Sequence, residues 1–230
     1  MEQYQAHSSA CNICGGVEFG PGPGGRSSRS GHPPFCNSCR SLERHRTARA
    51  AIIELWSEQF AKFDVLQISQ DRCVEPDWFA KHYVSIYGTE TSLDLQDIHR
   101  PTGTYDLVIC NHVLEHVADD RAALVELTRV IKDDGFVFLT FPDPANRATT
   151  TDWGFPREDQ HGHYRMYGRD VEDLFRETLP HKWVICQNVS DPVTGVGDLV
   201  YLLAKTDRGV ARLLEGYPDA EVICRPTNAP

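Results

Sequence analysis

The sequence predicts an α/β fold with an open sheet and a small metal-binding module ahead of it. The first observation is an apolar, strand-type run at 105–110, YDLVIC, which stops at Asn111 and His112. A helical pattern of apolar residues begins directly after it, so a strand is expected to give way to a helix at this point. The second observation is a pair of Cys-x-x-Cys motifs within the first 40 residues. Ligands of open α/β sheets bind where a strand gives way to a helix. The candidate site residues of this transition are Asn111, His112, Glu115 and His116.

The composition indicates one main domain with room for a small appendage. The chain has 230 residues, of which 40% are hydrophobic, and a formal net charge of −10. An acidic chain with a pI near 5.4 is not expected to bind nucleic acid in general, because phosphate neutralisation needs a dense basic surface. No apolar run approaches the roughly 20 residues that span a bilayer, and no export signal is apparent. We therefore expect a cytoplasmic protein that does not associate with membranes.

Four of the eight cysteines have the spacing of a zinc site. After a tail at 1–10 that we expect to be flexible, Cys11-x-x-Cys14 is followed, after 21 intervening residues, by Cys36-x-x-Cys39. In a reducing compartment, such pairs bind metal more often than they form disulfides. The intervening segment is too rich in Gly, Pro and Ser to build a core, so zinc is expected to organise a ribbon-like module over 1–40. Four thiolates close the coordination sphere, which favours a structural role.

A helix is predicted from Ser38 to Phe60, and its part at 41–60 is expected to link the module to the main domain. Arg44, His45 and Arg46 lie early on this helix. They are expected either to form a solvated face or, as the resemblance described below implies, to receive an anionic group of a substrate.

Alternating and helical patterns predict the elements of the main domain, at 61–206. A long segment at 142–160 lacks either pattern, and its Trp153, Phe155 and Pro156 suggest a lid over a substrate. A carboxyl-terminal extension at 207–230 is expected to hold a short helix at 210–214 and a loose tail. The predicted strands are 64–69, 82–87, 105–110, 136–141, 182–189 and 198–205, and the predicted helices are 113–132 and 168–179.

An ordered series of motifs carries a resemblance to a known family. Tyr105-Asp106 before an apolar strand, the run NHVLEHV at 111–117 and DGFVFLTFP at 134–142 resemble consecutive elements of class I S-adenosylmethionine-dependent methyltransferases of the type 11-like group. Further matches are Ser41, Arg44, His45 and Arg46 ahead of the domain and His163, Arg165, Tyr167 and Gly168 late in it. The resemblance implies a Rossmann-like, seven-stranded sheet whose last strand runs antiparallel, and S-adenosylmethionine as the cofactor.

The resemblance also implies where the cofactor binds. The loop after the first strand normally carries glycines, but here it reads Ser69-Gln70-Asp71-Arg72-Cys73. The second strand normally ends in a carboxylate for the ribose, whereas this chain has Tyr87 there and Glu90 three residues later. Asp94 stands at the interval of the residue that accepts the adenine amino group. The implied cofactor-binding residues are Ile68, Ser69, Gln70, Tyr87, Glu90, Asp94, Leu95, Asn111 and His112.

Histidines of the segment HGHYRMYG at 161–168 are the candidates for catalysis. A general base needs a pKa near the working pH, and His161 and His163 meet this need without much tuning. Arg165 could hold a substrate carboxylate or phosphate at two points. The alternative is that this segment only docks the following helix. His112 is expected to contact the cofactor or the substrate.

These patterns together predict methyl transfer to an oxygen or nitrogen of a small polar acceptor, such as a sugar or a natural-product scaffold. A second hypothesis is a degenerate, non-catalytic binding module, which the glycine-free loop and the missing ribose carboxylate favour. A third is a zinc hydrolase, because His112-x-x-Glu115-His116 matches the motif of inverted zinc peptidases. The sequence leaves the acceptor and the oligomeric state open.

Overall fold

The computed structural model describes residues 10–55 and 58–227, and its contacts divide the chain into two compact units. The first unit comprises the segment up to Trp56 together with 71–75 and 188–198, and the second unit comprises 57–70, 76–187 and 199–230. The tail predicted at 1–10 lies outside the described residues except for Ala10. Each unit is described by itself.

The first unit holds the four clustered cysteines and one long helix. A two-residue strand β1 (Phe19–Gly20) pairs antiparallel with β2 (Phe35–Cys36), and a short 3-10 turn, η1 (Pro23–Gly25), lies between them. The helix α1 (Glu43–Glu54) begins five residues later than the predicted helix. Residues 56–57 of that prediction lie outside the described chain, and a separate 3-10 turn, η2 (Glu58–Lys62), follows them in the second unit.

Arg46 anchors the first unit internally and was assigned wrongly from the sequence. Its side chain is fully buried, and its Nε and Nη2 each donate to a carboxylate oxygen of Asp191 at 2.7 Å. Its Nη1 donates to the carbonyl oxygens of Pro34 and Ser41. Burial and these four bonds exclude both a solvated face and an open anion site for this guanidinium. His45 also has a local role, because its Nδ1 accepts from the backbone N–H of Leu42 at the start of α1.

The second unit is built on a seven-stranded sheet, as expected from the resemblance. The strand order is β11-β9-β10-β6-β5-β3-β4. The pairs β4 with β3, β3 with β5 and β5 with β6 are parallel, whereas β10 is antiparallel to β6 and β11 is antiparallel to β9. The strands are β3 (Asp64–Ile68), β4 (Lys81–Ser85), β5 (Tyr105–Asn111), β6 (Ile131–Thr140), β9 (Trp183–Ser190), β10 (Gly197–Ala204) and β11 (Glu221–Cys224).

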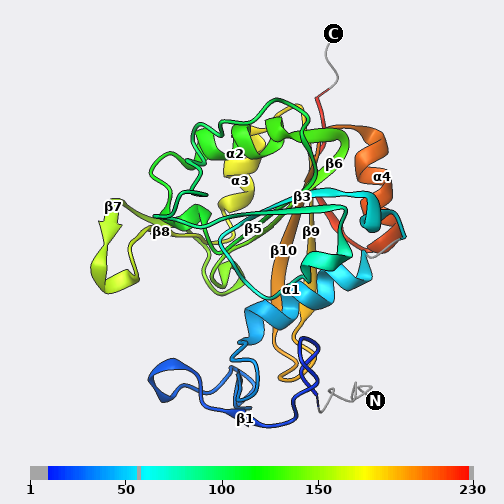
Figure 1. Ribbon diagram of the computed structural model, residues 1–230. Coiled ribbons are helices and arrows are strands. Elements are labelled where there is room, and N and C mark those ends of the chain that lie inside the picture. Colours follow the sequence, from blue (N-terminus) through cyan, green and yellow to red (C-terminus); the bar gives the residue numbers. More distant parts are fainter. Residues whose placement is uncertain (1–9, 56–57, 228–230) are drawn as a thin grey trace. The chain divides into compact units, whose positions relative to one another are not determined.

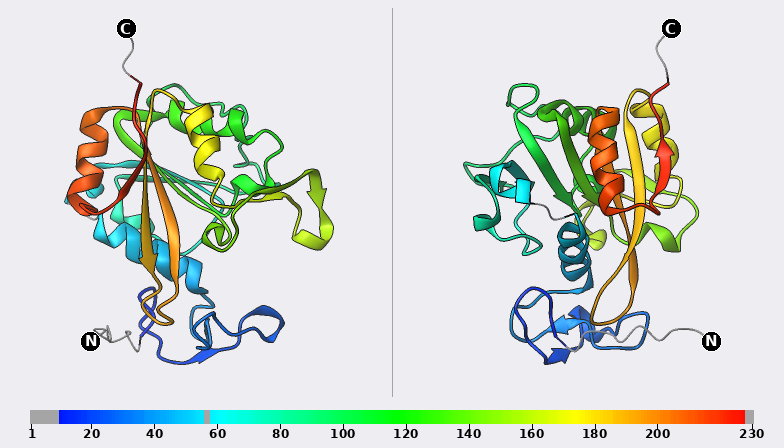
Figure 2. Two further views of the ribbon diagram at one scale, coloured as in Figure 1. Left: turned by 180° about the vertical axis from the view of Figure 1, so that it is seen from behind. Right: turned by 90° about the vertical axis from the view of Figure 1, so that its right-hand side faces the viewer.

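Helices cover both faces of this sheet (Figures 1 and 2). α2 (Asp120–Val130) and α3 (Val171–Thr178) lie on one face, and α4 (Asp207–Gly216) lies on the other. The residues at 107–110 of β5 are completely buried because the strand is covered on both sides, which explains its continuous apolar run. The short helix predicted at 210–214 is confirmed as part of α4, whereas the loose tail predicted after it is corrected, because the edge strand β11 lies there.

The transition after β5 also differs from the prediction. A 3-10 turn, η4 (Leu114–His116), comes first, and α2 begins only at Asp120. The side chain of Asp119 accepts from the backbone N–H of Ala122 at 2.9 Å and so caps the new helix. Because α2 starts at this cap, the apolar pattern that predicts one helix from residue 113 is divided between η4 and α2.

The segment predicted as an unstructured lid contains a strand. β7 (Thr151–Arg157) pairs antiparallel with β8 (His163–Met166), and the two form a ribbon that projects from the sheet in Figure 1. Short 3-10 turns, η5 (Pro144–Asn146) and η6 (Glu158–Gln160), flank β7, and another, η3 (Pro76–Trp78), precedes β4. Phe155 in the ribbon is 57% exposed.

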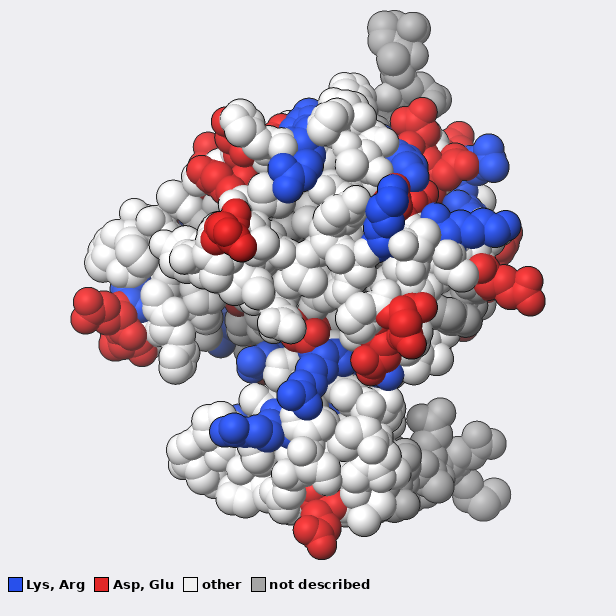
Figure 3. All heavy atoms as spheres, viewed as in Figure 1, with Lys and Arg blue, Asp and Glu red and all other residues white. Residues whose placement is uncertain are grey.

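No helix among residues 10–55 and 58–227 has the length and apolar character needed to cross a membrane. The face shown in Figure 3 carries both acidic and basic side chains.

Candidate functional site

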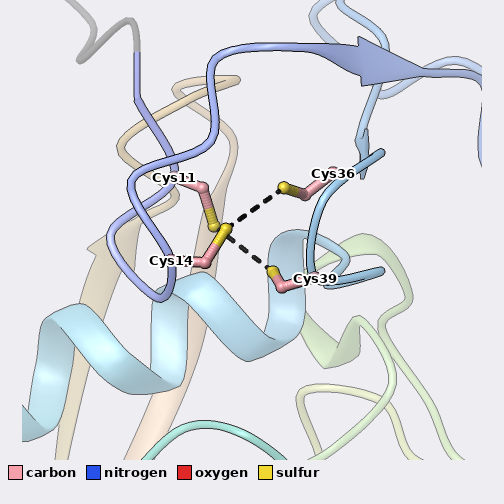
Figure 4. Close-up of side chains that lie close together, drawn as sticks. All are labelled: Cys11, Cys14, Cys36 and Cys39. Carbon is pink, nitrogen blue, oxygen red and sulfur yellow. Dashed lines mark hydrogen bonds between the residues drawn. The ribbon is translucent and has the colours of Figure 1, made fainter.

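The four cysteines of the two Cys-x-x-Cys motifs converge in the first unit (Figure 4). The Sγ atoms of Cys11 and Cys39 are 3.7 Å apart, as are those of Cys14 and Cys36, and all four lie within 4.8 Å of one another. A tetrahedron with 3.7 Å edges has a centre-to-corner distance of about 2.3 Å, which is the usual Zn–S bond length. The cluster therefore has the size and the donor set of a closed zinc–thiolate site.

In the second unit, the carboxyl ends of three parallel strands are level with one another. Ile68 at the end of β3 pairs with Ser85 of β4 and with Cys110 of β5. Ser69 and Asn111, which come directly after Ile68 and Cys110, therefore lie at one edge of the sheet. Asn111 is buried, and its Oδ1 accepts from Thr140 at 3.1 Å.

The backbone turns sharply at this edge. Ser69 and His112 both have left-handed conformations, with φ of 64° and 51°. This region favours glycine, and a side chain in it costs roughly 1 kcal/mol. Backbone hydrogen bonds hold both residues, because Ser69 N donates to Ser85 O at 2.8 Å and His112 N donates to Thr140 O at 3.1 Å. The loop after β3 thus keeps a glycine-like turn although it contains no glycine.

Asp94 and Leu95 follow β4 on a loop that is tied to the same edge. The hydroxyl of the buried Ser85 accepts from the backbone N–H of Leu93 at 2.9 Å. The exposed carboxylate of Asp94 accepts from the backbone N–H and the side-chain amide of Gln96, and these bonds lower the pKa of Asp94. Asp94 is therefore ionised at neutral pH and can accept further hydrogen bonds, next to the buried apolar side chain of Leu95.

Tyr87 and Glu90 lie in an exposed turn after β4. Tyr87 is 97% exposed, and Glu90 is also exposed. The turn is closed by Thr89, whose hydroxyl donates to Ile86 O at 2.8 Å. The carboxylate expected at the end of β4 is thus absent, and Glu90 is the acidic side chain of this turn.

Three histidines and a buried glutamate gather where η4 meets β8. The rings of His116 and His163 are perpendicular, with centroids 4.5 Å apart, and the ring of His161 lies 6.1 Å from that of His163. Glu115 is almost completely buried, and its Oε1 lies 4.0 Å from Nδ1 of His112. Burial and the neighbouring histidines lower the pKa of His163 to about 4, and burial also lowers the pKa of His116. Both rings are therefore neutral at pH 7.

Arg165 has several partners in the second unit. Its Nε donates to Asp152 at 2.8 Å, and its Nη1 and Nη2 donate to the carbonyl oxygens of Val117 and Ala118. The guanidinium is buried and also lies 3.4 Å from the carboxylate of Asp120. These contacts tie the ribbon to the turn after η4, which favours the docking alternative for Arg165.

The zinc-hydrolase hypothesis is wrong for the His112-x-x-Glu115-His116 motif. It requires two histidines one turn apart on an α-helix. His112 has a left-handed backbone outside any helix, and the motif continues as a 3-10 turn. The two imidazoles are therefore not presented on one helical face.

A sequence profile described as "Methyltransferase domain" matches residues 16–178, which is more than half of the chain. The chain belongs to this methyltransferase family.

Comparisons of this chain with solved structures find similar folds at low sequence identity. A Burkholderia thailandensis 1,6-didemethyltoxoflavin-N1-methyltransferase, with bound 1,6-didemethyltoxoflavin and S-adenosylhomocysteine, is 18% identical with a TM-score of 0.49, over 70% of this chain and 79% of that one. A Thermotoga maritima enzyme described as a possible histamine N-methyltransferase is 15% identical, with a TM-score of 0.45 over 71% and 92%. A Mesorhizobium loti S-adenosylmethionine-dependent methyltransferase is 10% identical, with a TM-score of 0.47 over 68% and 96%. A comparison with curated proteins finds no match.

Sequence reasoning missed two groupings of side chains in this protein. It gave no partner to Arg46, and it did not bring Glu115 and His116 together with His163, which is 47 positions beyond His116. No local pattern links these residues, because pairing of β7 with β8 places His163 beside η4.

A surface cavity of about 530 Å³ lies at the opposite end of β5 and β6. Four of its charged groups form ion pairs, Lys132 with Asp106 and Arg208 with Asp134, so we place no site there.

Proposed function

We propose that this protein is an S-adenosylmethionine-dependent methyltransferase that methylates an oxygen or nitrogen of a small polar acceptor. The observation that carries the proposal is the level edge formed by the ends of β3, β4 and β5, with left-handed turns at Ser69 and His112. Strained backbone conformations cluster at binding and active sites. They persist only where the surrounding structure holds them in place. Family membership supports the same assignment.

The residues of this edge suit the parts of the cofactor. The turn at Ser69 and Gln70, after Ile68, brings exposed backbone to the place where the methionine part would bind. Asp94, ionised, would accept the adenine amino group, and Leu95 would supply apolar contact. Asn111 and His112 would line the side next to the acceptor, and Tyr87 or Glu90 would approach the ribose from their exposed turn. When bound, S-adenosylmethionine supplies a sulfonium methyl group for direct displacement.

The histidines beside this edge would take up the proton of the methyl acceptor. Displacement at a methyl carbon depends mainly on alignment and on removal of one proton. His163 is neutral at pH 7 and can accept that proton, although a pKa of about 4 makes it a weak base. His161 is exposed next to it, and His112 lies at the strand end, so both are alternative acceptors of the proton. Arg165 would act as a positioning residue, through its bonds to Asp152 and to the turn after η4.

We further propose that the four cysteines hold one structural zinc ion. Its site would be closed, since all four positions of a tetrahedron are filled by sulfur. A reducing, cytoplasmic location would keep these thiols available for metal.

The test is a thermal-shift titration with S-adenosylhomocysteine. A ligand at a hundred times its Kd stabilises the native state by roughly 2.7 kcal/mol, which raises the Tm by about 5 °C or more for a domain of this size. Asp94→Ala should reduce the shift. Asp97→Ala, at an exposed aspartate of the same loop, is the matched control and should leave it unchanged. A flat titration with wild-type protein at millimolar ligand would contradict the proposal.

A second candidate function is a non-catalytic binding module on the same fold. The exposed turn after β4 favours it, because no carboxylate stands at the strand end to hold the ribose. In that case calorimetry would show no binding of S-adenosylmethionine or of its demethylated product. Binding of adenosine without any gain from the methionine part would mean that the altered loop has closed that half of the site.

A further inference from the structure

Glu115, His116 and His163 form a second cluster of metal-binding side chains, separate from the four cysteines. Their ligand atoms all lie within 4.8 Å of one another. Glu115 and His116 come from η4, whereas His163 comes from β8. The close approach of Gly162 to η4 brings the two segments together, since a Cβ atom on Gly162 would lie 3.9 Å from Nδ1 of His116.

We infer that Glu115, His116 and His163 bind a divalent transition-metal ion, which holds a hydroxyl oxygen of the methyl acceptor. The role of the ion in this inference rests on the proposed methyltransferase function, whereas the binding of the ion does not. It assigns these side chains to a metal site, and it narrows the acceptor to a molecule that presents a hydroxyl group.

The donor set selects the kind of metal. Two imidazole nitrogens and one carboxylate are typical ligands of zinc, iron, cobalt and related ions, and are poor ligands for magnesium or calcium. Three protein ligands leave at least one coordination position open. Ligands about 2.1 Å from a tetrahedral ion are about 3.4 Å apart. Each pair of ligand atoms would therefore have to approach by about 1.4 Å at most, through rotations of the side chains.

The surroundings suit an ion that must also meet a substrate. The side chain of Glu115 is 1% exposed, so a bond between its carboxylate and a cation would lie in a region of low dielectric constant, where the attraction is strong. His116 is exposed, and His163 is partly exposed, which gives the ion a path from solvent.

The site also adjoins the proposed cofactor edge. Glu115 Oε1 lies 4.0 Å from Nδ1 of His112, the residue that follows β5. A hydroxyl bound to a divalent ion loses its proton at a much lower pH than a free hydroxyl does. The proton leaves to solvent, the acceptor oxygen forms a bond to the methyl carbon, and the carbon–sulfur bond breaks with its electron pair on sulfur. A protein base is then unnecessary for this step, and His163 acts as a ligand of the ion instead.

The experiment measures metal binding directly. Zinc-loaded protein is dialysed against Co²⁺, and zinc and cobalt are counted per chain by elemental analysis. Zinc stays on the thiolates because its affinity exceeds that of cobalt. We expect about two metal ions per chain, one zinc on the thiolates and a second ion, either Co²⁺ or zinc, at the new site. Glu115→Gln and His163→Ala should each weaken this binding at least 100-fold.

His99→Ala, at an exposed histidine of the same unit, is the matched control and should bind Co²⁺ like the wild type. Circular dichroism checks the fold of each variant, and His116→Asn replaces Glu115→Gln if the latter unfolds. Absence of a second metal in the wild type would overturn the inference, and so would undiminished binding in folded His163→Ala. The S-adenosylhomocysteine thermal shift is recorded on the same samples. A thermal shift without Co²⁺ binding refutes only the metal site, whereas Co²⁺ binding without a thermal shift supports the site and contradicts the methyltransferase proposal.

Discussion

Replacing Cys36 by serine should remove the zinc and unfold the first unit while the second unit stays folded. Cys36 is completely buried, and its Sγ lies 3.7 Å from that of Cys14, on an edge of the proposed tetrahedron. The apparent free energy of binding of a structural zinc ion is about 10–16 kcal/mol. The first unit has roughly 70 residues, and ordinary packing would stabilise such a unit by only about 7 kcal/mol. Loss of the ion therefore removes more free energy than packing can supply.

The assay combines elemental analysis with limited proteolysis and circular dichroism. Wild-type protein should hold one zinc that Cys36→Ser lacks, and new cleavage sites should appear before residue 56. Cys73→Ser is the matched control, because Cys73 is equally buried in the same unit but lies outside the cluster. It should keep its zinc. The reasoning would be refuted if Cys36→Ser retained a full equivalent of thiolate-bound zinc, or lost it with no change in the protease pattern.

Three further predictions concern stability. Asp191→Ala should lower the free energy of unfolding of the first unit by about 3–5 kcal/mol, because it leaves the guanidinium of Arg46 buried without its counter-ion. Denaturant titration measures this loss, and a loss under 1 kcal/mol would contradict the reasoning. Burial, followed by the charge of a neighbouring arginine, lowers the pKa of His45 from 6.5 to about 4. Between these two pH values the folded state binds fewer protons than the unfolded state. The free energy of unfolding should therefore fall by up to about 3 kcal/mol as the pH drops from 6.5 to 4. His45→Asn should remove that part of the pH dependence, and identical pH profiles of the two proteins would refute the assignment. Gly168→Ala should destabilise the second unit by about 1–3 kcal/mol in thermal unfolding, since its Cβ would lie 2.5 Å from the backbone of Thr149, and an unchanged Tm would show that this backbone moves freely.

The proposed cofactor edge could be located from the sequence because its signals are local. An apolar run that is buried on both sides of a sheet, followed at once by polar residues, marks the end of β5 and placed Asn111 and His112 correctly at a strand end. The seven-stranded sheet was implied by the ordered motifs, and its parallel part was confirmed. The roles of the individual cofactor and catalytic residues stay predictions.

Errors arose where two elements share one pattern or where a segment pairs with a distant one. The apolar spacing after β5 could not distinguish one long helix from η4 followed by α2, because the decision depends on the cap formed by Asp119. The ribbon strand β7 was missed since its residues pair with β8 rather than pack in a core, and five of its seven residues are exposed. β11 was missed because an edge strand of four residues has too few positions to show alternation.

The sequence by itself determined which side chains are close along the chain: the two Cys-x-x-Cys pairs, the strand end at Asn111, and the glutamate next to His116. The tertiary structure alone decided which distant groups meet. It buried Arg46 against Asp191, 145 positions away, and it brought His163 beside Glu115 and His116. The physical reason is that a charge in a low-dielectric interior needs a partner at hydrogen-bonding distance, and only the packing of the strands and turns determines which residue that partner is.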